Sequence, residues 1–179
     1  MVLKAVLGIG LVLPRRVGAQ VPDPRQERPR ENDRLVFALG SRAGEVITPE
    51  DVSLGGPQLF AYPLDAATGV VRNGSRLNQV VVVRFDPVDL TNDTRARAAD
   101  GIVAYSGVCS HTGCDVTEWL ASTRRFLCPC HDSEFDPTDA ARVDFGPAPW
   151  RLAALPLKIV DGALVAAGGF IGRVGAAEQ

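Results

Sequence analysis

All cysteines and histidines of this 179-residue chain fall in two short segments. The first, box 1, reads Cys109-Ser110-His111-Thr112-Gly113-Cys114. The second, box 2, reads Cys128-Pro129-Cys130-His131-Asp132-Ser133. Each box offers a thiolate and an imidazole from one short loop, a donor set that suits a metal centre with mixed sulfur and nitrogen ligands. The candidate ligands are Cys109, His111, Cys128 and His131, which leaves one further cysteine in each box.

Three other interpretations compete with a binuclear iron cluster that is bound by two cysteines and two histidines. Two plain disulfides would leave both histidines unexplained. A structural zinc site with two cysteines and two histidines is chemically possible, but it does not require an extra cysteine in each box. A thioredoxin-like redox pair needs Cys-x-x-Cys, whereas box 2 has Cys-x-Cys. The binuclear cluster explains the donor set best.

The two boxes resemble those of the Rieske iron–sulfur proteins, both of cytochrome bc-type complexes and of the arsenite oxidase small subunit. The similarity covers roughly 102–149 in sequence detail. It implies one Rieske-type 2Fe-2S cluster per chain, with two cysteines on the buried iron and two histidines on the outer iron near solvent: Cys109, Cys128, His111 and His131. It also implies a disulfide between the second cysteines, Cys114 and Cys130.

The surroundings of the boxes match this family only in part. Gly146-Pro147-Ala148-Pro149 resembles the proline-rich loop that shields the cluster, and Ser133 stands where high-potential members place a hydroxyl facing a bridging sulfide. Phe135 replaces a frequent tyrosine, Thr112 a usual leucine and Asp132 a usual glycine. These three departures weigh against quinol docking, although not against the cluster.

Outside the boxes, the sequence predicts an all-β fold, a Rieske-type antiparallel sandwich or barrel with a small inserted cluster-binding subdomain. Short apolar runs alternate with turn residues, and Asp161-Gly162 joins two of them as a tight hairpin. Thr91–Asp100 is polar, and we expect a surface loop or one short exposed helix there. The predicted strands are Leu35–Leu39, Glu45–Ile47, Val80–Phe85, Ile102–Tyr105, Arg125–Cys128, Leu157–Val160 and Leu164–Ala167.

The chain divides into a signal or anchor segment over 1–19, a Pro- and charge-rich linker over 20–34, and a Rieske domain over 35–179 with its insertion at about 106–150. Residues 2–13 are apolar apart from one lysine. As a helix they would reach only about 18 Å, short of a bilayer core of about 30 Å. A small-residue cleavage site follows at 17–19, and 1–4 resembles the end of a twin-arginine export motif. We therefore expect the periplasm or the periplasmic face of the membrane.

Charge excludes one class of partner. Residues 1–34 carry seven Lys or Arg against four Asp or Glu, and the other 145 residues carry 12 against 17. This mildly acidic body argues against nucleic acid, which needs a basic patch.

The resemblance implies an electron-transfer subunit of an exported or membrane-associated respiratory oxidoreductase complex, not a stand-alone enzyme. Its expected partners are the other subunits, either a cytochrome or a molybdenum subunit, and a c-type cytochrome. The alternative is the quinol-oxidising subunit of a cytochrome bc complex, with quinol as a further partner. A Rieske ferredoxin or oxygenase component fits less well, because those proteins generally lack the two extra cysteines and no histidine remains for a mononuclear iron site. A purely structural module would show no redox activity.

Overall fold

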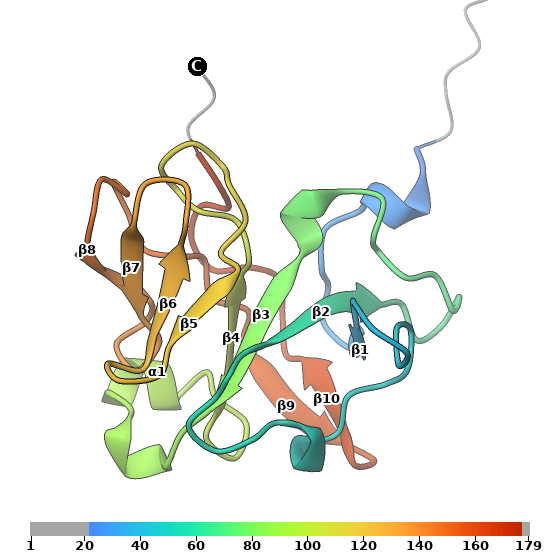
Figure 1. The fold of residues 1–179 in the computed structure, drawn as a ribbon. Coiled ribbons are helices and arrows are strands. Elements are labelled where there is room, and N and C mark those ends of the chain that lie inside the picture. Colours follow the sequence, from blue (N-terminus) through green and yellow to red (C-terminus); the bar gives the residue numbers. More distant parts are fainter. Residues whose placement is uncertain (1–21, 177–179) are drawn as a thin grey trace, which may run out of the picture.

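The computed structural model describes residues 22–176, which form two antiparallel β-sheets with a single four-residue α-helix (Figure 1). The larger sheet has the strand order β4-β3-β2-β1-β10-β9, and the smaller sheet has the order β5-β6-β7-β8. The strands are β1 (Arg34–Phe37), β2 (Leu59–Leu64), β3 (Val80–Arg84), β4 (Ile102–Ser106), β5 (Glu118–Leu120), β6 (Arg125–Cys128), β7 (Ser133–Asp136), β8 (Arg142–Phe145), β9 (Leu157–Val160) and β10 (Ala163–Ala166). The helical elements are α1 (Asn92–Arg95) and the 3-10 turns η1 (Pro24–Gln26), η2 (Pro49–Asp51), η3 (Arg76–Asn78) and η4 (Pro87–Asp89). The predicted all-β class is confirmed.

The larger sheet curls until its far edge meets the segment that leads into β9. Tyr105 of β4 forms a bridge with Ala154, and the Leu155 N–H donates to the Ala104 carbonyl at 2.9 Å. These contacts join the outer edge of β4 to the chain just before β9. The sheet is therefore a partly closed barrel, as the strand pattern predicts.

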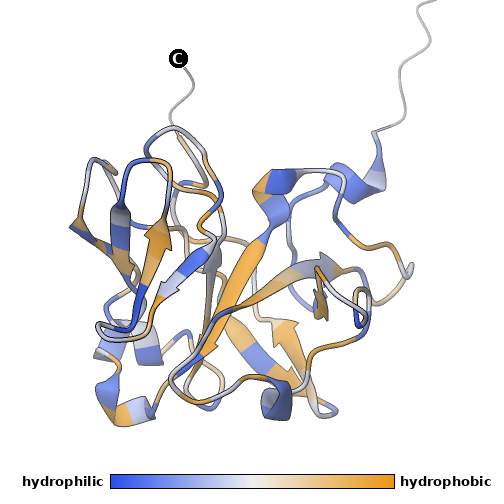
Figure 2. Cartoon of the chain, in the orientation of Figure 1, coloured by the Kyte–Doolittle hydropathy of each residue, from blue (hydrophilic) through white to orange (hydrophobic). Residues whose placement is uncertain are grey.

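The apolar run of β3 is explained by burial of both faces of the strand. Val80 and Val82 pack into the barrel interior, whereas Val81 and Val83 belong to a second core on the other side of the sheet. All four valines are fully buried, and Figure 2 shows most of β3 as hydrophobic. A strand that is covered on both sides reads as a continuous hydrophobic run, because neither face meets water.

The second core fills the space between β3–β4 and the smaller sheet. That sheet is a meander of β5 to β8, and it lies between β4 and β9 in the chain (Figure 1). Trp119 of β5 stacks edge-on against Phe126 of β6 and lies beside Phe85 at the end of β3. These aromatic contacts seat the smaller sheet on the outer face of the barrel.

Several strand predictions needed correction. Glu45–Ile47 is no strand: Val46 forms one isolated bridge with Val36. The sequence reading missed β2, which contains Pro63, a residue that lowers the expectation of a strand. It also missed β5, β7 and β8, whose residues are mixed with charges.

Two local predictions, the hairpin turn and the polar segment Thr91–Asp100, can be compared directly with the structure. The β9–β10 hairpin is confirmed, with φ of 51° at Asp161 and 74° at Gly162, as a two-residue turn requires. Within Thr91–Asp100, the short helix α1 is present, but Thr94 and Ala99 are buried, so this segment is not a fully exposed surface loop.

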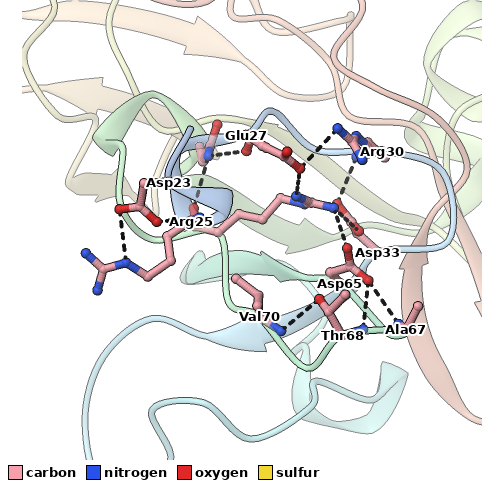
Figure 3. A network of polar contacts seen from close by, with 11 residues as sticks. Asp23, Arg25, Glu27, Arg30, Asp33, Asp65, Ala67, Thr68 and Val70 are labelled. Atoms are coloured by element: carbon pink, nitrogen blue, oxygen red, sulfur yellow. Dashed lines mark hydrogen bonds and ion pairs between the residues drawn. The ribbon is translucent and has the colours of Figure 1, made fainter. Parts of the chain in front are cut away.

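Part of the predicted linker over 20–34 lies within the described residues, and there it makes buried ion pairs with the barrel. The guanidinium of Arg72 is 1% exposed and pairs with Asp33 at 2.7 Å, with Glu27 at 2.8 Å and with Asp65 at 3.0 Å (Figure 3). Asp33 is itself buried, with 4% of its side chain exposed. The N-terminal segment is therefore fastened to the barrel by a buried charge network.

The predicted signal or anchor segment over 1–19 lies outside the described residues. No helix within residues 22–176 has the length and apolar character needed to cross a bilayer.

Replacing Arg72 with methionine should destabilise the protein by about 3–5 kcal/mol, because the buried Asp33 carboxylate loses its countercharge. Urea unfolding followed by circular dichroism measures this loss. Arg30→Met is the matched control, since Arg30 pairs with Glu27 in the same network but is 62% exposed. Arg30→Met should lower the free energy of unfolding by at most about 1 kcal/mol. Equal losses in the two variants would show that burial of the pair does not set the stability.

Candidate metal centre

Two neighbouring loops carry the predicted ligands. Box 1 follows β4 and is closed by its own backbone: the Cys109 N–H donates to the Cys114 carbonyl at 2.8 Å, and the Gly113 N–H donates to the Cys109 carbonyl at 3.1 Å. Box 2 is the turn of the β6–β7 hairpin, where Cys128 pairs with Ser133. Both loops lie at the same end of the molecule (Figure 1). Each box is thus a short turn on the rim of a rigid sheet.

The four predicted ligands are arranged by depth. Cys109 and Cys128 are 1% and 2% exposed and belong to the core beneath the smaller sheet. His111 is half-buried, and His131 is exposed. The two imidazole rings stand edge to face, with their centroids 4.6 Å apart. The structure therefore brings the two boxes together, with thiols on the inside and imidazoles towards solvent.

Two features of these side chains fit a metal site. The Nδ1 atom of His111 is buried and has no hydrogen-bond partner within the described residues, which is costly for a polar atom unless something else binds it. Burial raises the pKa of the Cys128 thiol to about 11, and the neighbouring Cys109 adds to the rise. Backbone N–H groups of Cys130 and His131 oppose this increase. They would stabilise a thiolate once a metal has displaced the proton.

The remaining cysteines link the two boxes. The structure bonds the sulfurs of Cys114 and Cys130 at 2.15 Å. The Cys128 sulfur lies within 4.8 Å of both. Three sulfur atoms therefore gather at the junction of the loops, although two of them are bonded to each other and only the third is a free donor.

The proline-rich segment closes the site from one side and contacts both boxes. The Ala148 N–H donates to the Ser133 hydroxyl at 3.2 Å, and the Ser110 hydroxyl donates to the Trp150 carbonyl. Gly146 has a φ of 90°, and a Cβ atom there would lie only 2.6 Å from the Cα of Ser133. This segment therefore approaches box 2 so closely that only glycine fits. Pro147 and Pro149 are exposed, and Ala148 is buried.

Sequence reasoning missed Arg76, Ser110 and Trp150, which hold box 1 in place. Arg76 of η3 donates to the Gly113 carbonyl at 2.6 Å and to Asp115 at 2.7 Å. Ser110 is bonded to Trp150, as described above. No sequence pattern links Arg76 to box 1, since 37 residues separate it from Gly113. Ser110 could have been considered, because it lies inside the box and is a small hydroxyl residue.

The three departures from the family pattern occupy different environments. Asp132 has a φ of 55°, a left-handed conformation that glycine adopts freely and aspartate tolerates, so its side chain does not prevent the turn. Phe135 is fully buried in the core that also contains Cys109 and Cys128. Thr112 is exposed, with its hydroxyl 3.7 Å from the Cys114 sulfur.

Gly146→Ala should destabilise the protein by about 2–4 kcal/mol, since it combines left-handed strain with a clash against the box 2 backbone. Gly162→Ala provides the matched control. Gly162 also has a positive φ, of 74°, but nothing lies within 4 Å of its would-be Cβ, so only about 1–2 kcal/mol should be lost. Urea titration measures both variants, and a control as unstable as Gly146→Ala would rule out the close approach as the cause.

Comparison with known proteins agrees with this geometry. The family model described as "Rieske [2Fe-2S] domain" matches residues 62–156. The cytochrome bc1 complex Rieske iron-sulfur subunit of Streptomyces lividans is 38% identical over 144 residues, which cover 78% of this chain and 84% of that protein. The subunit of the same name from Mycobacterium tuberculosis is 35% identical over 163 residues, covering 80% of this chain but only 38% of the relative.

Among solved structures, the ferredoxin of carbazole 1,9a-dioxygenase from Nocardioides aromaticivorans is 19% identical with a TM-score of 0.44. That match covers 69% of this chain and 94% of the ferredoxin. The family model spans more than half of the chain, and the Streptomyces relative is matched over most of its length. The chain belongs to the Rieske [2Fe-2S] family, and its cofactor is a Rieske-type 2Fe-2S cluster.

Proposed function

We propose that this chain is the Rieske electron-transfer subunit of a membrane-associated respiratory complex of the cytochrome bc1 type, and that it passes single electrons towards a c-type cytochrome. The observation that carries the proposal is the convergence of two buried thiols and two outer imidazoles from boxes 1 and 2. The relatives named above, both subunits of cytochrome bc1 complexes, support this choice of complex. They favour it over the molybdenum-enzyme alternative.

In this proposal, Cys109 and Cys128 hold the inner iron, and His111 and His131 hold the outer iron. The buried thiols lie in the apolar core, which excludes water from the inner side of the site. The exposed ring of His131 gives the outer side a direct contact with a partner. When bound, the cluster accepts and donates one electron at a time.

The proposal includes a location outside the cytoplasm. Cys114 and Cys130 are close enough to be bonded, and a lasting disulfide forms in an oxidising compartment. The bond would fix box 1 to box 2. The apolar N-terminal residues 2–13 are consistent with export or anchoring.

Two of the three departures from the family pattern, Asp132 and Thr112, argue less strongly against a quinol-oxidising complex once their positions in the structure are considered. Asp132 keeps the backbone conformation that the turn requires. Thr112 lies exposed at the tip, where a partner can contact it. Quinol therefore stays a proposed partner, together with a cytochrome subunit of the same complex.

The purified protein should contain about two irons and two acid-labile sulfides per chain, because the site offers four ligands for a binuclear cluster. His111→Ala should abolish the cluster, since the described residues nearby offer no replacement nitrogen donor. Iron and sulfide analysis together with visible absorption measure both results. Asp115→Asn is a control beside box 1 that should keep its iron. Stoichiometric zinc in place of iron would contradict the proposal.

Ser133→Ala should lower the midpoint potential by up to roughly 100 mV, because a hydrogen bond to a charged acceptor contributes about 1.5–3 kcal/mol and about 1.4 kcal/mol corresponds to 59 mV. The Ser133 hydroxyl accepts from the Ala148 N–H, so its own proton is available to a cluster sulfur. Phe135→Tyr should raise the potential if the new hydroxyl reaches a ligand sulfur.

The matched control is Ser110→Ala, an equally buried serine whose proton is already donated to the Trp150 carbonyl. This variant should shift the potential much less. Protein-film voltammetry compares the wild type with the three variants. Equal shifts for Ser133→Ala and Ser110→Ala, with intact clusters, would contradict a specific role for the Ser133 hydroxyl.

A further inference from the structure

Three arginines from separate parts of the chain line one cavity beside box 1. Arg28 follows η1, Arg76 belongs to η3, and Arg173 lies in the segment after β10. The cavity has a volume of about 470 Å³. Gly113 of box 1 and Val108, which directly precedes box 1, also line it. This site lies outside the set of cluster ligands.

Each of these guanidinium groups is held in position by a specific contact. Arg28 donates to the Leu77 carbonyl at 2.8 Å, and Arg76 donates to the Gly113 carbonyl at 2.6 Å. The Arg173 guanidinium stacks over the Trp150 ring, 5.1 Å from its centroid. A guanidinium has five N–H donors, so each group keeps donors that these contacts do not use. The side chains are therefore ordered before any ligand arrives, which reduces the entropy cost of binding.

Among the described residues, the positive charge of this cavity is only partly balanced. Within residues 22–176, the only carboxylate in ion-pair contact with any of the three arginines is that of Asp115, which lies 2.7 Å from Arg76. The three arginines and Asp115 together leave a net charge of two positive units. This excess stands on a chain whose overall charge is −2. An anion with two charges would neutralise the cavity.

We propose that this cavity binds a phosphate group. Guanidinium groups match the oxygens of phosphate in a two-pronged hydrogen-bonding geometry, and charge-assisted bonds of this kind are about twice as strong as neutral ones. At neutral pH a phosphate monoester carries close to two negative charges, which matches the excess in the cavity. The open cavity is large enough to accept the group together with part of the molecule that bears it.

The same phosphate monoester group has two sources, a soluble phosphate or the headgroup of a lipid such as phosphatidic acid. Arg28 lies shortly after the apolar residues 2–13 in the sequence, so a membrane surface is a natural source if those residues anchor the chain. The chemistry recognised by the arginines is identical in the two cases. Binding to inorganic phosphate and binding to vesicles therefore have to be measured separately.

The bound phosphate would also be linked to the redox state of the cluster. Arg76 contacts the Gly113 carbonyl within box 1, and Trp150, under Arg173, accepts a hydrogen bond from Ser110. Reduction adds one negative charge to the cluster, so the reduced protein should bind phosphate more weakly. By reciprocity, bound phosphate lowers the midpoint potential. This redox link rests on the proposed function, whereas the binding site does not.

Calorimetry of the full-length, cluster-loaded protein with inorganic phosphate tests the site directly. Arg28→Gln and Arg173→Gln should each weaken binding by about tenfold or more, because each removes a charge-assisted contact. Arg76 is left unchanged, since it also holds box 1. The control is Arg42→Gln, which removes an equal charge from a residue that pairs with Glu45 and Asp51 and does not line the cavity. The affinity of the Arg42→Gln variant for phosphate should stay within about twofold of the wild-type affinity.

Two further measurements separate the sources and the redox link. Preferential binding to phosphatidic acid over phosphatidylcholine vesicles, lost in Arg173→Gln but kept in Arg42→Gln, would identify the lipid source. Phosphate binding without this vesicle preference would identify the soluble source. Saturating phosphate should lower the potential by about 28 mV, if the reduced protein binds it about threefold more weakly, at 59 mV per tenfold.

The outcomes distinguish this inference from the proposed function. No phosphate binding, or equal binding by wild type and Arg173→Gln, would overturn the site whatever the state of the cluster. Arginine-dependent binding with an unchanged potential would keep the site and overturn the redox link. A protein without an iron cluster would refute the proposed function, while calorimetry would still decide the phosphate site.

Discussion

The structure depends on the burial of two thiols, those of Cys109 and Cys128, at the junction of two sheets. Both sulfurs lie in the core between β3–β4 and the smaller sheet, so neither can be removed from its place without opening that core. A buried thiol with a raised pKa is a poor anion by itself. Iron bound by these two thiolates would offset this cost, because the metal would replace the thiol proton at side chains that the core already holds in place.

The rest of the fold places box 1 and box 2 against this pair. The barrel supplies β3 and β4, whose outer faces support the smaller sheet, and the β6–β7 hairpin presents box 2 at its turn. Box 1 is held by hydrogen bonds from outside it, above all those of Arg76 and Trp150. Gly146 brings the proline-rich segment onto box 2 at a distance that no larger residue allows. The ligand geometry is therefore a property of the sheets more than of the loops.

The sequence predicted the chemistry of the site better than it predicted the strands and contacts that support the two boxes. Cysteine and histidine at fixed spacing indicate a metal centre because few other arrangements use those side chains together. The run Val80–Val83 is equally clear, since only a strand buried on both faces is apolar throughout. The strands β7 and β8 are hard to detect, because charged residues interrupt both of them and burial does not alternate along either one.

Long-range contacts account for what the sequence could not show. In the sequence, nothing distinguishes Arg72 from the other arginines. In the structure its side chain binds Asp33, which is 39 residues away, and fastens a segment that composition assigns to a linker. Arg76 likewise reaches Gly113 from a separate turn, and three arginines meet in one cavity only after folding. Charged residues at large separation carry no periodicity, so their pairing has no pattern in a single sequence. Propensity and motif describe local structure, whereas these contacts are set by the tertiary fold.

The most direct test of the central claim is pulsed electron paramagnetic resonance on the reduced protein grown with ¹⁵N-histidine. The chain has two histidines, so the labelled nitrogens report on His111 and His131 alone. We expect strong magnetic coupling between the reduced cluster and two ¹⁵N nuclei, one from each ring, as mixed cysteine and histidine ligation requires. A reduced cluster with no strongly coupled ¹⁵N nucleus would contradict the assignment of both boxes.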